Sequence, residues 1–224
     1  MEETFVLALQ NHKKNNLEAA EDLYNKILKK DPNHFESIYN LSKLLAQTKR
    51  FNLAKPLLYK ATKLKPNYEK AHNNLGIILT KLKEEQKAIN CFEKAIQIDP
   101  TYTDAHYNLG IALQELGEHR KAIVCYEKTI HLKTDYAKAY NNLGIALHEL
   151  GEHRKAINVY KKAISNVPNS IIINGLSDLF KSIKLGNVTK TNSKELKELF
   201  LFLYRENSIN HDDVFNNSKF TISK

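Results

Sequence analysis

Residues 108–123 read NLGIALQELGEHRKAI and residues 142–157 read NLGIALHELGEHRKAI, so two stretches 34 residues apart differ only at Gln114 and His148. The likeness extends to both sides: residues 103–136 laid over 137–170 give 19 identities in 34 positions. Near copies at a fixed separation of this size indicate a repeat protein, in which each unit buries its apolar face against the next.

The same 34-residue frame continues back to the first residue without a gap. It predicts five units, at residues 1–34, 35–68, 69–102, 103–136 and 137–170. The seventh position is leucine in every unit: Leu7, Leu41, Leu75, Leu109 and Leu143. The twentieth is alanine in every unit: Ala20, Ala54, Ala88, Ala122 and Ala156.

Each unit has the pattern of two helices joined by a short turn. In the third unit Ala71, Leu75 and Leu79 recur at the spacing of one helical face. The eighth position is small in every unit, which predicts a close approach by the backbone of a neighbouring helix. Gly117 and Gly151 indicate the turn between the two helices, and prolines such as Pro100 mark the end of the second helix.

These positions resemble the tetratricopeptide repeat (TPR) family. Its small residues, alanine, aromatic residue and proline are all present in the fifth unit, as Gly144, Ala156, Tyr160, Ala163 and Pro168. The resemblance covers residues 1–170 and implies an all-α fold, a right-handed α-α superhelix or TPR solenoid. Two departures stand out: Thr134 replaces one proline, and the family's aromatic at position 4 is met only by Tyr140.

The resemblance also implies that the first helices line a concave groove, and helical spacing then says which side chains face it. These are the candidate peptide-binding residues. They are Asn40, Asn74, Asn108, Asn142, Tyr39, Tyr107, Lys43, Lys70, Lys138, Ile77, Ile111 and Ile145.

Four of these candidates form a ladder of asparagines at position 6. A side-chain amide both donates and accepts, so such a ladder suits the backbone of an extended peptide. Neighbouring isoleucines would bury apolar side chains, and Lys70 and Lys138 would favour acidic ones. A similar ladder occurs in the repeats of protein O-GlcNAc transferases, where it holds the substrate backbone. The alternative is that duplication copied one structural asparagine four times.

Another ligand site of the family is not expected here. Repeats that clamp the C-terminal carboxylate of chaperones use asparagine at position 9 and arginine at position 6, and no unit of this chain has either. We therefore do not expect chaperone binding.

The histidines and cysteines do not form a motif for metal binding or catalysis. His148 and His153 are five residues apart, whereas a metalloprotease helix needs a spacing of four. Cys91 and Cys125 lie at equivalent positions of adjacent units, beyond ordinary disulfide reach. The sequence predicts no enzyme activity, no metal and no cofactor.

The net charge of +9 comes from 34 Lys+Arg against 25 Asp+Glu, and only four of the basic residues are arginine. Arginine is the residue suited to bidentate phosphate and guanine contacts, and the lysines are spread over the surface, so no nucleic acid is expected. No apolar run approaches the roughly 20 residues of a membrane span. With two cysteines, a cytoplasmic location is expected.

Residues 171–224 fall outside the repeat and are expected to form a helical capping or connector region. A helix is predicted from Ile171 to near Gly186, with an apolar face that includes Phe180 and Ile183. A polar linker follows, and a second helix is expected to begin at Ser193. The region loosely resembles the connector between such repeats and a transferase domain in bacterial proteins.

The sequence thus predicts a protein–protein interaction scaffold that binds an extended peptide or a partner helix in its groove. The alternative is the substrate-recruiting module of a bacterial glycosyl-, methyl- or sulfotransferase whose catalytic domain lies downstream or on a partner chain. The identity of the protein partner is not encoded in any motif of the chain.

Overall fold

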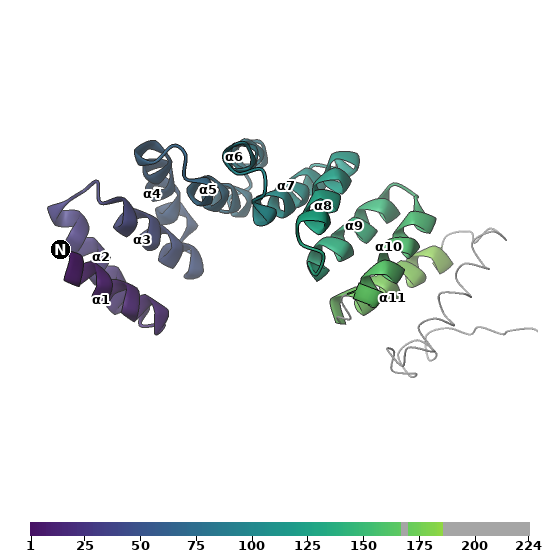
Figure 1. Cartoon of the computed structure of the whole chain (residues 1–224), viewed down its shortest axis with the longest axis horizontal. Coiled ribbons are helices and arrows are strands. Elements are labelled where there is room, and N and C mark those ends of the chain that lie inside the picture. The colour runs from purple at the N-terminus through teal and green to yellow at the C-terminus, as the bar shows by residue number, and fades with distance from the viewer. Residues whose placement is uncertain (167–169, 186–224) are drawn as a thin grey trace, which may run out of the picture. The chain divides into compact units, whose positions relative to one another are not determined.

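The computed structural model describes residues 1–166 and 170–185, which form α-helices throughout and contain no strand (Figure 1). The expected helix from Ser193 and the fifth unit's Pro168 lie outside the described residues. The helices are α1 (Glu2–Lys13), α2 (Leu17–Lys30), α3 (Phe35–Gln47), α4 (Phe51–Leu64), α5 (Glu69–Lys81), α6 (Glu85–Ile98), α7 (Thr103–Glu115), α8 (His119–Leu132), α9 (Ala137–Glu149), α10 (His153–Asn166) and α11 (Ser170–Leu185).

The helices follow the period of the sequence. The second helices of the repeats, α2, α4, α6, α8 and α10, begin at intervals of 34 residues. The all-α solenoid prediction is therefore confirmed. The helix α11 lies where a helix from Ile171 was predicted, and the side chains of Phe180 and Ile183 are outside the described part.

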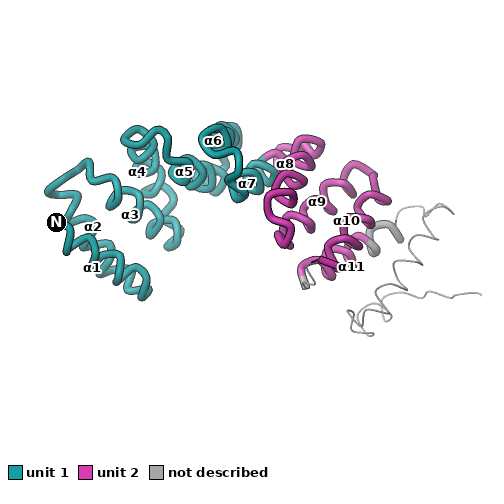
Figure 2. The backbone as a smooth tube through the Cα atoms, viewed as in Figure 1, with its two compact units in different colours: residues 1–112 teal, residues 113–224 magenta. Residues whose placement is uncertain are grey.

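The chain divides into two compact units, residues 1–112 and 113–224 (Figure 2). Unit 1 contains α1 to α6 and most of α7, and unit 2 contains α8 to α11. In both units the core consists of the recurring apolar positions, including the aromatic residues Tyr24, Phe92 and Tyr160, each at most 1% exposed. The division of residues 1–170 into five repeats, followed by a connector, stays a prediction.

The small residue at position 8 makes room for a side chain, which differs from the backbone approach that we expected. A methyl group added at Gly76 would lie 2.5 Å from the ring of Phe92 in the second helix of the same repeat. A methyl at Gly144 would overlap the ring of Tyr160 in the same way. The lack of a side chain at the glycine therefore leaves the space that the aromatic ring at position 24 occupies.

The turn between the two helices of each repeat uses the left-handed backbone region. Gly117 and Gly151 have φ values of 76° and 75°, as expected for turn glycines. The same position has φ values of 62° at Asn15, 59° at Lys49 and 61° at Lys83. The two lysines hold a conformation that is unfavourable for side chains with a Cβ atom.

Histidine replaces the family's aromatic at position 4 in two repeats and has a defined partner there. The Nε2 of His72 lies 2.9 Å from the carbonyl oxygen of Pro66, and the Nε2 of His106 lies 3.0 Å from that of Pro100. Since a carbonyl only accepts, each ring nitrogen donates. Tyr140, which follows Thr134 instead of a proline, has a buried hydroxyl without a partner among the described residues.

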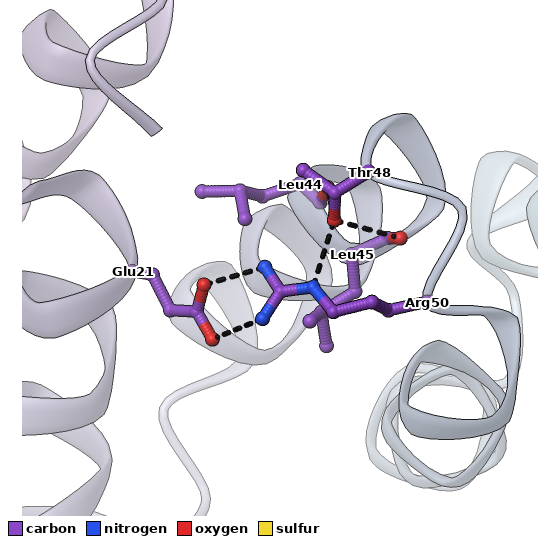
Figure 3. A network of polar contacts seen from close by, with 5 residues as sticks. All are labelled: Glu21, Leu44, Leu45, Thr48 and Arg50. Atoms are coloured by element: carbon purple, nitrogen blue, oxygen red, sulfur yellow. Dashed lines mark hydrogen bonds and ion pairs between the residues drawn. The ribbon is translucent and has the colours of Figure 1, made fainter. Parts of the chain in front are cut away.

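Arg50, at the start of the second repeat's α4, connects that repeat to α2 (Figure 3). Its Nη1 donates to Oε1 of Glu21 at 2.9 Å, and its second Nη bonds the other carboxylate oxygen. Its Nε donates to Thr48 Oγ1 at 2.9 Å, and that hydroxyl donates to the carbonyl of Leu44 at 3.0 Å. This bidentate contact between Arg50 and Glu21 fixes the orientation of α2 against the α3–α4 turn.

Candidate peptide-binding site

A cleft of about 310 Å³ lies in unit 1 among α1, α3, α4 and α5. It is lined by His12, Ser42, Lys43, Ala46, Gln47, Leu58, Asn74, Ile77 and Ile78. The structure thus brings together three of the residues predicted from the sequence, Lys43, Asn74 and Ile77. Each of them projects from a first helix, α3 or α5, at a position that helical spacing assigned to the groove.

The other lining residues were missed from the sequence alone. His12 and Gln47 sit at positions 12 and 13 of their repeats, near the ends of the first helices. Position 12 varies from repeat to repeat and gives no signal for His12, whereas Gln47 lies four residues after Lys43 on the same helical face, so helical spacing could have identified it. Leu58 belongs to a second helix, which was not expected to line the groove. The one signal in the sequence is that position 24 is leucine in this repeat and aromatic in the others.

Two asparagines of the ladder make hydrogen bonds between successive repeats. The Nδ2 of Asn74 donates to the hydroxyl of Tyr39 at 3.0 Å, and the Nδ2 of Asn108 donates to Oδ1 of Asn73 at 2.9 Å. In both cases position 6 bonds the side chain at position 5 of the preceding repeat. Position 5 of the first repeat is Phe5, which offers no such acceptor. Asn40 donates instead to the carbonyl of Glu36 at 2.8 Å.

These bonds favour a structural role for at least part of each amide. Asn74 still has one amide hydrogen and its Oδ1 without a hydrogen bond among the described residues. Asn74 also lines the cleft, so its amide has hydrogen-bonding capacity left for a ligand there.

Tyr39 is held in an aromatic cluster beside the cleft. Its ring stacks on Phe35 at a centroid distance of 6.0 Å and meets Tyr68 edge-on at 5.2 Å. Burial raises the pKa of the Tyr39 hydroxyl far above its ordinary value, so the hydroxyl stays protonated. The cluster fixes Tyr39, and Tyr39 in turn fixes the amide of Asn74.

Lys43 is exposed at the edge of the cleft, with its Nζ 5.7 Å from the centroid of the Tyr39 ring. It forms no salt bridge within residues 1–166 and 170–185. Its nearest helical neighbour of opposite charge, Glu36, pairs with Lys65 at 2.9 Å. The cleft therefore has an uncompensated positive charge at its rim.

His12 forms the end of the cleft on α1. Its Nδ1 lies 3.3 Å from the Tyr24 hydroxyl and its Nε2 lies 3.4 Å from Oε1 of Gln47. Burial lowers the pKa of His12, and the charge of Lys43 lowers it further, against an opposing effect of the bond to Gln47. The imidazole is therefore held mainly neutral at physiological pH.

The remaining candidates do not line this cleft. Tyr107, Asn108 and Ile111 lie on α7 in unit 1, and each is half-buried. Lys70 is exposed near the start of α5. Unit 2 carries Lys138, Asn142 and Ile145 on α9, where Ile145 is 36% exposed. Their role in ligand binding stays a prediction.

Two of the histidines considered in the sequence analysis contact each other, and the two cysteines do not form a disulfide. The Nδ1 atoms of His148 and His153 lie 2.9 Å apart, although their sequence spacing does not fit a single helical face. Within the described residues, no group of three His, Cys, Asp or Glu side chains is placed to hold a metal ion. Cys91 and Cys125 are not joined by a disulfide, and burial raises the pKa of Cys91 to about 11. No described helix is both long and apolar enough to cross a membrane.

Comparisons with known proteins identify the class to which these helix pairs belong. Family models described as tetratricopeptide repeats match residues 35–68 and 102–168, and a third, described as a TPR repeat, matches residues 78–117. No curated protein sequence matches the chain.

Solved structures give the same answer. The crystal structure of the MamA protein is 33% identical, with a TM-score of 0.68, and the match covers 74% of this chain and 93% of that one. YrrB, described as a TPR protein with an unusual peptide-binding site, is 22% identical with a TM-score of 0.66, covering 75% and 87% of the two chains. A thermophilic TPR protein from Thermus thermophilus is 20% identical with a TM-score of 0.62, covering 80% and 98%.

The chain belongs to the tetratricopeptide repeat family. Its repeats make it a protein-interaction scaffold, as the sequence predicted at this general level. The finer question is which surface binds a partner and what that partner presents.

Proposed function

We propose that the chain binds an extended peptide segment of a partner protein along its first helices, and that the cleft among α1, α3, α4 and α5 is one anchoring point. The observation that carries the proposal is that Lys43, Asn74 and Ile77, all assigned to the groove from the sequence, line one cleft. YrrB, which shares the fold, is described as having a peptide-binding site.

The chemistry of the cleft suits a peptide better than a rigid apolar ligand. Apolar side chains such as Ile77, Ile78 and Leu58 supply the walls, and polar groups at the rim can meet a peptide backbone. The Oδ1 of Asn74 can accept a backbone N–H, and its spare amide hydrogen can donate to a backbone carbonyl. The bond to Tyr39 holds the amide in place before the peptide arrives.

The test is a selection from a displayed library of random peptides with the full chain, followed by calorimetry on the peptides obtained. Ile77→Glu places a charge in the apolar wall and is expected to weaken binding by at least about tenfold. Val124→Glu is the matched control, because Val124 is 63% exposed on α8 and does not line the cleft. Peptides that bind Ile77→Glu as tightly as the unchanged chain would contradict the proposal.

The asparagine ladder is tested on the same peptides with Asn74→Ala, Asn108→Ala and Asn142→Ala. Loss of affinity in variants that remain folded supports backbone binding by the ladder. Unchanged affinity leaves the inter-repeat bonds as the ladder's sole role. The alternative role as a recruiting module for a transferase stays a prediction. Of the connector expected at residues 171–224, residues 186–224 lie outside the described residues.

A further inference from the structure

The cleft in unit 1 has features that restrict the kind of peptide it accepts. It combines apolar walls with one fixed charge, and its size is at the lower end of the range of about 300–1,000 Å³ that ligand pockets span. A space of this size can hold a large apolar side chain but not a folded ligand. The restriction concerns the same site as the proposed function and therefore rests on it.

The walls of the cleft call for an apolar side chain. Ala46, Leu58 and Ile78 come from three different helices, α3, α4 and α5, and Ile77 adds a half-buried side chain at the mouth. Leu58 replaces the aromatic residue that position 24 carries as Tyr24, Phe92, Tyr126 and Tyr160 in the other repeats. In this repeat the side chain at position 24 is therefore aliphatic, and it forms part of the apolar lining of the cleft.

The rim of the cleft calls for a negative charge. Of its lining residues, Lys43 bears the one fixed charge, and its ammonium has no carboxylate partner among the described residues. The other polar groups there are His12, which already contacts Tyr24 and Gln47, and the amides of Gln47 and Asn74. A peptide carboxylate next to the apolar side chain that enters the cleft could pair with Lys43, and it would not have to displace a carboxylate of this chain from Lys43.

We propose that this cleft recognises an acidic-apolar motif within an extended peptide, in which a leucine-sized side chain enters the space beside Leu58 and a neighbouring aspartate or glutamate pairs with Lys43. The backbone of the motif meets Asn74. Leu58 selects for an apolar anchor in the peptide. Lys43 selects against a basic residue next to that anchor, because the two positive charges would repel each other at the rim.

The experiment uses the same library of displayed random peptides and reads their sequences. With the unchanged chain, the selected peptides are expected to be enriched in an acidic residue next to a large apolar one. With Lys43→Glu, the enrichment is expected to change to a basic residue beside the same apolar anchor. Lys128→Glu is the matched control, since Lys128 is an exposed lysine on α8 that does not line the cleft, and it should leave the motif unchanged.

One selected peptide then provides a quantitative check by calorimetry. Replacing its acidic residue by the corresponding amide is expected to weaken binding to the unchanged chain by about two- to fivefold and to leave binding to Lys43→Gln nearly unaffected. Lys43 is exposed, so both variants are expected to keep the fold, which circular dichroism verifies.

The outcomes separate the two proposals. Peptides that lose affinity in Ile77→Glu but show no acidic-apolar enrichment, or no change of motif in Lys43→Glu, would overturn the motif and leave the proposed function standing. Selected peptides that are indifferent to both Ile77→Glu and Lys43→Glu, or a selection that yields no binder, would overturn both.

Discussion

The side-chain amide of Asn108 donates a 2.9 Å hydrogen bond to Oδ1 of Asn73, which lies one repeat earlier and is 3% exposed. Asn74 makes the equivalent bond to Tyr39, so the contact between positions 6 and 5 occurs twice in unit 1. Residues chosen as ligand contacts from the sequence therefore also join successive repeats.

Removal of the first of these bonds should be measurable as a loss of stability. Asn108→Ala leaves the buried Oδ1 of Asn73 without its donor, and we expect the free energy of unfolding to fall by about 1–3 kcal/mol. Asn40→Ala is the control, because Asn40 bonds only the carbonyl of Glu36 in its own helix and is expected to have a smaller effect. Urea denaturation measures both, and equal losses would contradict the role of the inter-repeat bond.

The turn lysines should be sites of stabilisation. Lys49 and Lys83 have φ values of 59° and 61°, where a Cβ atom is unfavourable and glycine is not. Lys49→Gly and Lys83→Gly are each expected to raise the free energy of unfolding by about 0.5–1 kcal/mol. In contrast, Lys81→Gly, in the last turn of α5, should lower it by up to about 1 kcal/mol. Destabilisation by all three in thermal unfolding would refute this.

The small residue at position 8 is expected to be required by the ring it faces. In Gly144→Ala the new methyl overlaps the Tyr160 ring, which is 1% exposed, and we expect a loss of about 1–3 kcal/mol in chemical denaturation. The second repeat provides a natural compensation, since it pairs Ser42 with Leu58 at the same positions. The double variant Gly144→Ser/Tyr160→Leu should therefore be more stable than Gly144→Ser alone, and failure to recover any stability would argue against the pairing.

The close pair of histidines predicts a pH dependence of stability. Burial lowers the pKa of His148, and the nearby His153 lowers it further, while Glu149 raises it in part. Below the ordinary histidine pKa of about 6.5, the unfolded chain therefore binds more protons than the folded chain does. The stability contributed by neutral His148 is present above that pH and is lost as the pH falls through the lower folded-state value. His12, whose pKa is also lowered, acts in the same direction.

We therefore expect the melting temperature to fall on acidification from neutral pH, and the fall to be smaller in His148→Gln. His131→Gln, which changes an exposed histidine at the end of α8, is the control and should retain the full pH dependence. An identical pH profile for His148→Gln and the unchanged chain would exclude the histidine pair as a cause.

Most of the fold could be predicted from periodicity alone. The leucines at position 7 and alanines at position 20 define which helical faces are buried, and the 34-residue spacing sets where each second helix begins. Glycines at the turns were likewise recognisable. The lysines in the same backbone conformation were not, because the local propensity of lysine gives no sign of it and only the tight connection imposes it.

The candidate site was predicted in part. Lys43, Asn74 and Ile77 were found because position in a repeat fixes which face of the first helix a side chain occupies. His12 was missed because its position varies among the repeats, and Gln47 was not selected although helical spacing puts it on the same face as Lys43. The hydrogen-bond partners of the asparagines were also missed, since a residue's position does not say whether its amide faces solvent or the neighbouring repeat.

By itself the sequence determined the fold class and the repeat length, because burial of one apolar face per helix gives a periodic pattern, and it predicted a set of first-helix residues as a candidate binding surface. Only the tertiary structure decided which of those residues meet at one cleft, that Lys43 has no carboxylate partner among the described residues, and that His148 and His153 touch. Those facts depend on distances between helices, and the packing of neighbouring repeats sets these distances.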